Sequence, residues 1–401
     1  MIGRGRREGR AERLLAIRLA GTAERRAAEA GEIERLGRAV DYDWLAAGLD
    51  GGRLLPLLGS RLVDALPHAV PAGFRAAVDA SLTRDRRRAT VVEQVALQLA
   101  RELERAGIRA VLLKGPHLAE RLYRDVGMRS SNDIDLLVDP RDFHPAVGVL
   151  ERLGYGREPA AAWIGDLPLF EASLRAGDGW RPPVDLHWRL HWYEERFSRG
   201  FVARSRPDLS GARIAQPVDE LAALLLFWCR DGLSGLRHAA DVAAWWDRYG
   251  GELAPEGLEE IATEQPALRR PLAAAALLAE QAVGVPADRL LAGLDRAAPR
   301  MRLALRFANL VEPASDLQNQ AGVVAVDALL SERLAARGFV RRHLLLPPAV
   351  IGEIFGIPPS ARGRRALHRF LYAARRGVRL AWATVAVLTS GRGAMLRGQA
   401  R

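Results

Sequence analysis

The chain of 401 residues is 49% hydrophobic and 27% charged, which is typical of a globular protein with room for two or three domains, or one core with helical additions. Its single cysteine, Cys229, excludes a disulfide framework or a cysteine-rich zinc site within one chain and favours a reducing compartment. The net charge of +11 and the isoelectric point of about 10.7 suit an anionic partner such as a nucleotide, a nucleic acid or a membrane surface. Because the basic residues are scattered among acids, a solvated basic surface is the simpler interpretation.

The two ends of the chain predict no integral membrane segment. Residues 1–21 are basic and their apolar run is interrupted by Arg18, which indicates an amphipathic helix rather than a signal peptide. The longest apolar stretch near the C-terminus, residues 380–389, is too short to span a bilayer. For the basic C-terminal tail we expect a packed terminal helix in preference to contact with a membrane surface. The sequence therefore predicts a cytoplasmic protein.

In chain order, residues 1–90 predict helices. Asp43 is the expected N-cap of a helix in "DYDWLAAGL", and helical periodicity then continues over several turns until Gly107. After Gly107 the pattern changes to short aliphatic or alternating runs that predict strands; these are residues 108–113, 133–138, 167–175 and 183–192. Residues 116–125 and 143–154 have helical spacing, and from about residue 215 the sequence again predicts helices.

These elements predict an α+β fold, in which a small mixed-sheet core is embedded in mainly helical N- and C-terminal regions. We expect a helical region over 1–90, an α/β core over 91–200 and a second helical region over 201–401.

An acidic pair starts the second predicted strand. In "NDIDLLV" a strand would place Asp133 and Asp135 on one face and the apolar Ile134 and Leu136 on the other. Two carboxylates this close repel each other and need a compensating cation. Magnesium suits them because it takes oxygen ligands and keeps positions for water and substrate phosphates. The alternative is a strand edge with two solvated acids.

A third carboxylate comes from "VDLHWRL", where Asp185 and His187 alternate with apolar residues. If this strand lies beside the first, Asp185 completes a three-carboxylate site, in which it would bind a metal or accept the proton of an attacking hydroxyl. His187 would either orient a ligand or be a hydrogen-bonded structural histidine. An exposed polar sheet face is the alternative.

Lys114, the sole lysine of the chain, ends the first predicted strand and is followed by Gly115. Glycine lets the backbone approach a ligand, and the N-terminus of the following helix offers free N–H groups to phosphate. A compact ammonium group would add a charge where a guanidinium does not fit. The alternative is a lysine at a strand end with its ammonium group in solvent.

The segment "GMRSSND" precedes the acidic pair. We expect Arg129 to hold a triphosphate oxygen and Ser131, or its neighbour Ser130, to donate to another. The alternative is a Gly-Ser turn with an exposed arginine. Further along, Arg237 and Asp241 are four residues apart on a predicted helix, which indicates a surface ion pair.

These residues resemble the nucleotidyltransferase superfamily with the polymerase-beta-like fold, and more narrowly the bacterial family of uncharacterised nucleotidyltransferases. The resemblance rests on "LLKG" at 112–115, "LY" at 122–123, "GMR" at 127–129, "DIDLLV" at 133–138 and "VDLHW" at 184–188. It implies that Asp133, Asp135 and Asp185 are the metal-binding and catalytic carboxylates. The chain departs from the superfamily at Pro116, where serine or glycine is usual, and in a longer gap from Gly115 to Asp133.

The sequence therefore predicts a magnesium-dependent enzyme that moves a nucleoside monophosphate, most simply AMP from ATP, to a hydroxyl of an unknown acceptor. Lys114, Gly115, Arg129 and Ser131 would bind the nucleoside triphosphate. The acceptor would be a small molecule, a peptide or RNA. The competing hypothesis is a regulatory module on the same fold that binds a nucleotide or RNA without turnover.

Overall fold

The computed structural model describes residues 9–157, 171–191, 194–252, 256–311, 316–331 and, between 345 and 389, all except 347, 349–350 and 353–354. The elements before the sheet are α1 (Arg10–Ala20), α2 (Ala23–Ala28), α3 (Ala30–Gly37), α4 (Tyr42–Gly51), the π-helical turn η1 (Leu55–Gly59), α5 (Ser60–Ala65) and α6 (Ala72–Arg105). The central elements are β1 (Ala110–Leu112), α7 (Pro116–Tyr123), the 3₁₀ turn η2 (Val126–Met128), β2 (Ile134–Val138), α8 (Phe143–Arg152), β3 (Tyr155–Arg157), β4 (Glu171–Ala176) and β5 (Val184–His187). The remaining elements are α9 (Arg196–Arg204), β6 (Arg206–Pro207), β7 (Arg213–Ile214), α10 (Pro217–Arg230), α11 (Leu236–Tyr249), α12 (Glu256–Glu264), α13 (Pro266–Val283), α14 (Ala287–Leu290), α15 (Pro299–Leu305), α16 (Asp316–Leu330) and α19 (Arg362–Thr389).

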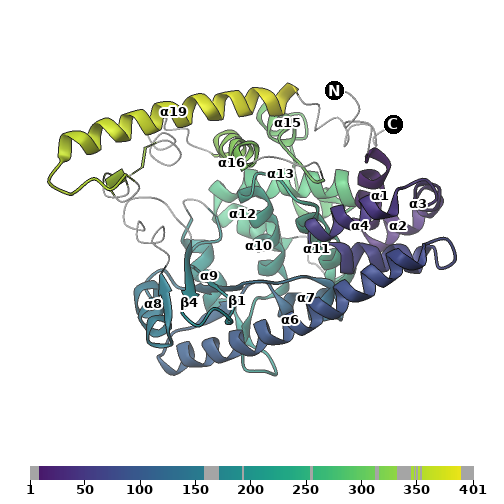
Figure 1. The fold of residues 1–401 in the computed structure, drawn as a ribbon, viewed down its shortest axis with the longest axis horizontal. Coiled ribbons are helices and arrows are strands. Elements are labelled where there is room, and N and C mark those ends of the chain that lie inside the picture. The colour runs from purple at the N-terminus through teal and green to yellow at the C-terminus, as the bar shows by residue number, and fades with distance from the viewer. Residues whose placement is uncertain are drawn as a thin grey trace.

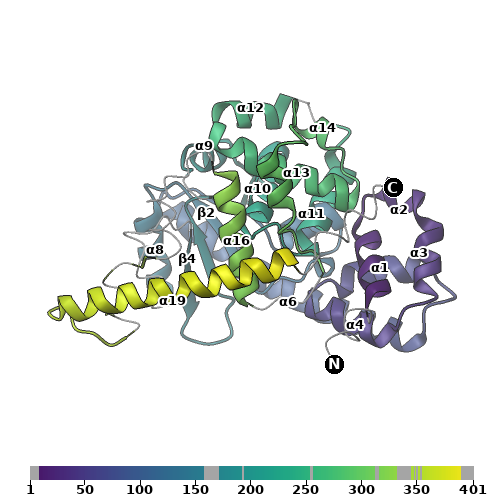
Figure 2. The same ribbon diagram turned by 90° about the horizontal axis from the view of Figure 1, so that it is seen from above.

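The described strands form one mixed sheet in the order β3-β4-β5-β2-β1-β7-β6. β2 pairs in parallel with β5, and β1 with β7, while the other neighbours are antiparallel. Helices occupy both ends of the molecule, with α1 to α4 at one end and α8 beside the sheet at the other (Figures 1 and 2). The structure therefore confirms an α+β fold with a mixed sheet among helices.

The sheet is buried on both faces. Ile134, Leu136 and Leu186 point into a core made with α6 and α8. On the opposite face, Val111 and Leu137 belong to a larger core that includes α10, α11 and α13. Figure 1 shows the sheet between these two groups of helices. Alternation along β2 and β5 therefore directs every second side chain toward the larger helical group.

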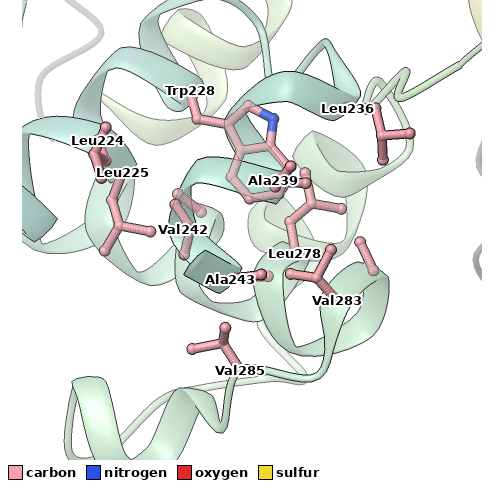
Figure 3. Close-up of a cluster of buried hydrophobic side chains, with 14 of the residues drawn as sticks. Leu224, Leu225, Trp228, Leu236, Ala239, Val242, Ala243, Leu278, Val283 and Val285 are labelled. Atoms are coloured by element: carbon pink, nitrogen blue, oxygen red, sulfur yellow. The ribbon is translucent and has the colours of Figure 1, made fainter. Parts of the chain in front are cut away.

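Helix α10 is the centre of the larger core. It is apolar on all sides, and its residues from Asp219 to Arg230 are buried, as expected for a helix enclosed by others. Trp228 lies fully buried between α11 and α13, in contact range of Val242 and Leu278 (Figure 3). Cys229 is also buried, and burial raises the pKa of its thiol.

Most predicted elements form where expected, with two wrong boundaries and three omissions. The strand predicted over 183–192 ends at His187, so its second half is wrong as far as residue 191. The N-cap of α4 is Asp41, not Asp43, because the Asp41 carboxylate accepts hydrogen bonds from the backbone N–H groups of Asp43 and Trp44. The short strands β3, β6 and β7 were not predicted, since none is long enough to show alternation. Residues 167–170 and Trp192 of the predicted strands lie outside the described residues. The division into 1–90, 91–200 and 201–401 stays a prediction.

Within the described part of the chain, no helix is both long enough and apolar enough to cross a membrane.

Replacing Trp228 by alanine should lower the free energy of unfolding by about 3–5 kcal/mol, because it removes a fully buried aromatic ring. Trp228→Phe is the matched control, since the indole Nε1 finds no hydrogen-bond acceptor among the described residues and the ring itself supplies the contacts. Urea denaturation of both variants measures the difference. A Phe variant as unstable as the Ala variant would contradict this assignment.

Candidate active site

The predicted neighbourhood of the two acidic strands is confirmed. β2 and β5 are adjacent and parallel, and Asp135 lies directly opposite Asp185 in the register. Because Ile134 and Leu186 point into the core under α6 and α8, the side chains of Asp135 and Asp185 point toward the larger helical group. His187 lies on this same face of β5 and is fully buried.

Asp135 is the most strongly contacted of these carboxylates. Its Oδ1 atom lies 3.2 Å from Lys114 Nζ and 3.0 Å from His187 Nε2. Burial alone would raise the pKa of the Asp135 carboxyl, but Lys114 and His187 outweigh burial and hold the pKa well below its usual range. Asp135 is therefore an ionised carboxylate with a lysine counter-ion.

Lys114 connects the sheet to helix α10. Its ammonium group lies 4.0 Å from the centre of the Phe227 ring, a cation–π arrangement that partly replaces lost hydration. Lys114 also acts electrostatically on Asp231, which follows α10 and is bonded to His238 Nε2 at 3.1 Å. The lysine is therefore partly buried near two acids, whereas the sequence left it either at a phosphate or in solvent.

Asp185 is more accessible than Asp135. It is partly exposed, and the hydroxyl of Ser173 on β4 donates to its Oδ1 atom at 2.6 Å. Ser173 is the residue directly opposite Asp185 in the antiparallel β4–β5 pair. Asp185 thus has a cross-strand neighbour on each side, Asp135 on β2 and Ser173 on β4.

Asp133 precedes β2 and is partly exposed. It acts electrostatically on Arg237, near the start of α11. Burial, with a smaller contribution from nearby Arg129, lowers the pKa of the Arg237 guanidinium to about 10, against the opposing effect of Asp241 and Asp133. Arg237 Nε is buried and has no hydrogen-bond partner among the described residues. The Arg237 guanidinium, which carries several N–H donors, therefore lies near Asp133, the first carboxylate of the acidic pair.

Arg129 forms a buried ion pair that the sequence did not predict. Its Nε lies 3.0 Å from Asp241 Oδ2, and the Tyr123 hydroxyl donates to Asp241 Oδ1 at 2.8 Å. Burial lowers the pKa of Arg129, but Asp241 outweighs it and the pKa is raised overall. Asp241 is 1% exposed, so the predicted surface pair between Arg237 and Asp241 is wrong. Arg129 is not an exposed turn residue, and its Nη1 atom has no partner in the described part of the chain.

At the junction from β1 to α7, the backbone has a conformation that lets another group approach it closely. Gly115 has φ +84° and ψ −151°, a region that is nearly restricted to glycine. A Cβ atom there would lie 3.3 Å from Ser131 Oγ, so Gly115 and the buried Ser131 are direct neighbours. Pro116 occupies the first turn of α7, where its missing N–H is not needed for the helix.

The carboxylates do not converge as a metal centre. Among the described residues, no group of three or more His, Cys, Asp or Glu side chains is placed to hold a metal ion. The structure brings side chains of the candidate site into two groups. The first group consists of Asp135, Asp185, His187 and Lys114. The second group lies near Asp133 and consists of Arg129, Arg237 and Asp241. The carboxylate oxygens are donors that suit a hard cation. In this structure the positive charge at Asp135 comes from Lys114.

The fold and these residues define an α+β protein with paired carboxylates on a mixed sheet. The chain belongs to the family described as "Uncharacterised nucleotidyltransferase", whose model matches residues 38–284, more than half of the sequence. The matched range contains all the predicted site residues and the helices α10 and α11 that cover them. A search of curated proteins gave no match. Family membership supports a nucleotidyltransferase and a nucleotide substrate, in agreement with the family predicted from the motifs.

Sequence reasoning underestimated His187, Arg237 and Asp231. For His187 the signal was present, since its alternation with Asp185 in "VDLHW" placed both on one face. Arg237 and Asp231 reach the site only through the packing of α10 and α11 on the sheet. Their local sequence contains no pattern that predicts this contact.

Gly115→Ala should lower the free energy of unfolding by about 1–3 kcal/mol, because alanine is strained at φ +84° and its Cβ would press on Ser131. Gly177→Ala is the control, since Gly177 has no positive φ and its added Cβ would meet nothing within 4 Å. Thermal and urea unfolding measure both variants. Equal stability of the two variants would show that the tight junction is not needed.

The lowered pKa of Asp135 predicts a pH-dependent contribution to stability. A carboxyl whose folded pKa is depressed stabilises the protein above its unfolded pKa of about 3.9, and this contribution is lost as the pH falls below that value. The stability advantage of the wild type over Asp135→Asn should therefore shrink between pH 7 and about pH 3. Asp79→Asn, an exposed acid on α6, should differ from the wild type by a nearly constant amount. Urea midpoints across this range test the prediction, and an advantage that grows on acidification would contradict it.

Proposed function

We propose that this protein transfers a nucleoside monophosphate, most simply AMP from ATP, to a hydroxyl group of an acceptor that is a small molecule, a peptide or RNA. The observation that carries the proposal is the register of β2 and β5, which sets Asp135 directly opposite Asp185 beside Lys114. Membership in a nucleotidyltransferase family supports the reaction type.

A divalent cation, proposed to be Mg²⁺, would be held by Asp133 and Asp135. Asp185 would join as a third ligand after a shift that brings the carboxylates together, since they form no three-ligand group among the described residues. All three offer carboxylate oxygens, the donors that this ion prefers. When bound, the ion would supply positive charge that offsets charge developing on the phosphates. Asp135 needs a cation in any state because it is ionised and buried, and Lys114 serves that need without the ion.

The triphosphate would lie against the junction of β1 with α7. Lys114 and the backbone at Gly115 face it from one side, with Ser131 next to Gly115. Arg129 would contribute its Nη1 atom, which has no partner among the described residues while its Nε holds Asp241. The pairing with Asp241 orients the guanidinium in advance, so little side-chain entropy would be lost on phosphate binding. Arg237 is a further donor beside Asp133.

The acceptor hydroxyl would meet Asp185, the more accessible of the two opposed carboxylates. The Ser173 hydroxyl donates to Asp185 Oδ1 at 2.6 Å and so orients the carboxylate. In this role Asp185 would accept the hydroxyl proton as the oxygen attacks the α-phosphorus, and pyrophosphate would leave. Asp185 would thus act either as third ligand or as general base.

A second candidate function is a binding module without turnover. It is favoured by the contacts that already occupy Asp135, together with the lack of a metal-binding trio among the described residues. In such a module Lys114 would remain on Asp135, and nucleotide or RNA would bind through the arginines.

ATP labelled at the α-phosphorus, supplied with Mg²⁺ and fractionated cell extract as a source of acceptors, tests the proposal. We expect label at the α-position, but not at the γ-position, to enter an acceptor. Asp133→Asn should reduce this transfer by about 10²-fold or more, because it removes a carboxylate proposed to hold the cation that offsets charge on the reacting phosphates. Asp79→Asn, an exposed acid outside the site, should leave the rate unchanged.

Nucleotide binding, measured separately by calorimetry, distinguishes the two candidates. Tight ATP binding without transfer, unchanged by Asp133→Asn, would favour the binding module. If the protein binds neither a nucleoside triphosphate with Mg²⁺ present nor RNA, both candidates fail.

A further inference from the structure

The C-terminal helix α19 is attached to the protein along one side. Near its N-terminal half, Tyr372 packs on Leu346 and Ile351, and Arg365 donates hydrogen bonds to the Ile357 carbonyl. The buried residues of α19 are Leu380, Ala383 and Val387, and these belong to its C-terminal half, which crosses α16 (Figures 1 and 2). The N-terminal half extends beyond α16 along the outside of the molecule. The expected terminal helix is thus packed on one side.

A second apolar stripe runs along α19 and faces solvent. It consists of Leu367 (56% exposed), Phe370 (68%), Leu371 (52%), Val378 (60%), Trp382 (74%) and Val385 (55%). Leu371, Val378 and Val385 are seven residues apart, close to two helical turns, so they fall on one line. Leu380 is two residues beyond Val378 and therefore lies about 200° around the helix. The exposed stripe is on the side opposite the stripe that contacts α16.

The charge of α19 has a single sign. Between residues 362 and 389 the sequence has no aspartate or glutamate. It has seven arginines, which are Arg362, Arg364, Arg365, Arg369, Arg375, Arg376 and Arg379. Helical geometry places Arg364, Arg375 and Arg379, all exposed, along one edge of the apolar stripe. Their charge complements an anionic surface.

We propose that the exposed stripe of α19 binds an anionic lipid surface, with the helix lying in the plane of the headgroups. Large apolar and aromatic side chains on one side and arginines at its edge are the composition of helices that insert at this depth. The arginines would remain at the level of the lipid phosphates while Phe370 and Trp382 enter the acyl boundary. With seven charges in the helix, it lies on the surface rather than crossing it.

The opposed positions of the two stripes make this binding compatible with the observed fold. Leu380, Ala383 and Val387 would keep their contact with α16 while the exposed stripe meets the lipid. No element has to detach, and the site residues on the sheet take no part. The proposal therefore stands independently of the nucleotidyltransferase reaction.

Flotation of the full-length protein with lipid vesicles tests the proposal. We expect binding to vesicles of equimolar phosphatidylcholine and phosphatidylglycerol, and much weaker binding to phosphatidylcholine alone. The double variant Phe370→Ser, Trp382→Ser should lose binding. Trp180→Ser is the matched control, because Trp180 is 65% exposed and belongs to the turn between β4 and β5 rather than to α19. The double variant Arg375→Gln, Arg379→Gln should bind roughly thirtyfold less to the anionic vesicles. The control Arg87→Gln, Arg88→Gln changes exposed arginines on α6 and should bind as the wild type does.

The outcomes that would contradict the proposal can be told apart from one another. Equal binding of all variants, or equal binding to both kinds of vesicle, would overturn the proposal. So would a wild type that binds neither vesicle but elutes as a dimer that Phe370→Ser, Trp382→Ser converts to a monomer, since the stripe would then be an interface between two copies. Because the substituted side chains are exposed, unfolding of a variant is not expected, and circular dichroism of each variant checks this.

Discussion

The buried ion pair between Arg129 and Asp241 fixes the position of the acidic strand relative to the helices that cover it. Arg129 precedes β2 and Asp241 belongs to α11. Both charges are almost fully removed from water, which is costly unless each hydrogen-bonding group finds a partner. Tyr123 supplies one such partner from α7. A pair of this kind contributes little net stability, but losing one member costs far more, so it specifies how the segments meet.

The packing of helix α10 is the second constraint on where the site residues lie. Because the helix is apolar all round and enclosed by α11 and α13, its axis cannot shift without opening the main core. Its last turn carries Phe227 to Lys114, and Asp231 follows directly. The charges around the carboxylates are therefore arranged by hydrophobic packing some distance away. This explains why residues far apart in the sequence, such as Lys114 and Phe227, lie within one site.

Local patterns predicted the features that depend on local geometry. Alternation in "DIDLLV" and "VDLHW" was sufficient to place Asp135, Asp185 and His187 on one face, because side chains alternate in any strand. Gly115 was expected at a tight junction for a similar reason. The partner of Asp241 could not be found this way. The spacing of Arg237 and Asp241 favours a local pair. Asp241 is instead buried against Tyr123 of α7 and pairs with Arg129, which precedes β2. Tertiary contacts override helical spacing wherever the helix face is buried.

The same reasoning explains why Lys114 is a lysine in a chain that otherwise uses arginine. The cation beside Asp135 must fit between a carboxylate oxygen at 3.2 Å and the face of Phe227 at 4.0 Å. An ammonium group is compact and donates in three directions, whereas a guanidinium is broad and planar and would need a matched fork of acceptors. His187 also lies at hydrogen-bond distance from Asp135 Oδ1 and is itself fully buried, so a second group already occupies this oxygen. The geometry at Asp135 thus selects a small positive charge, and this requirement is shared by the lysine that is present and by the divalent cation proposed to bind there.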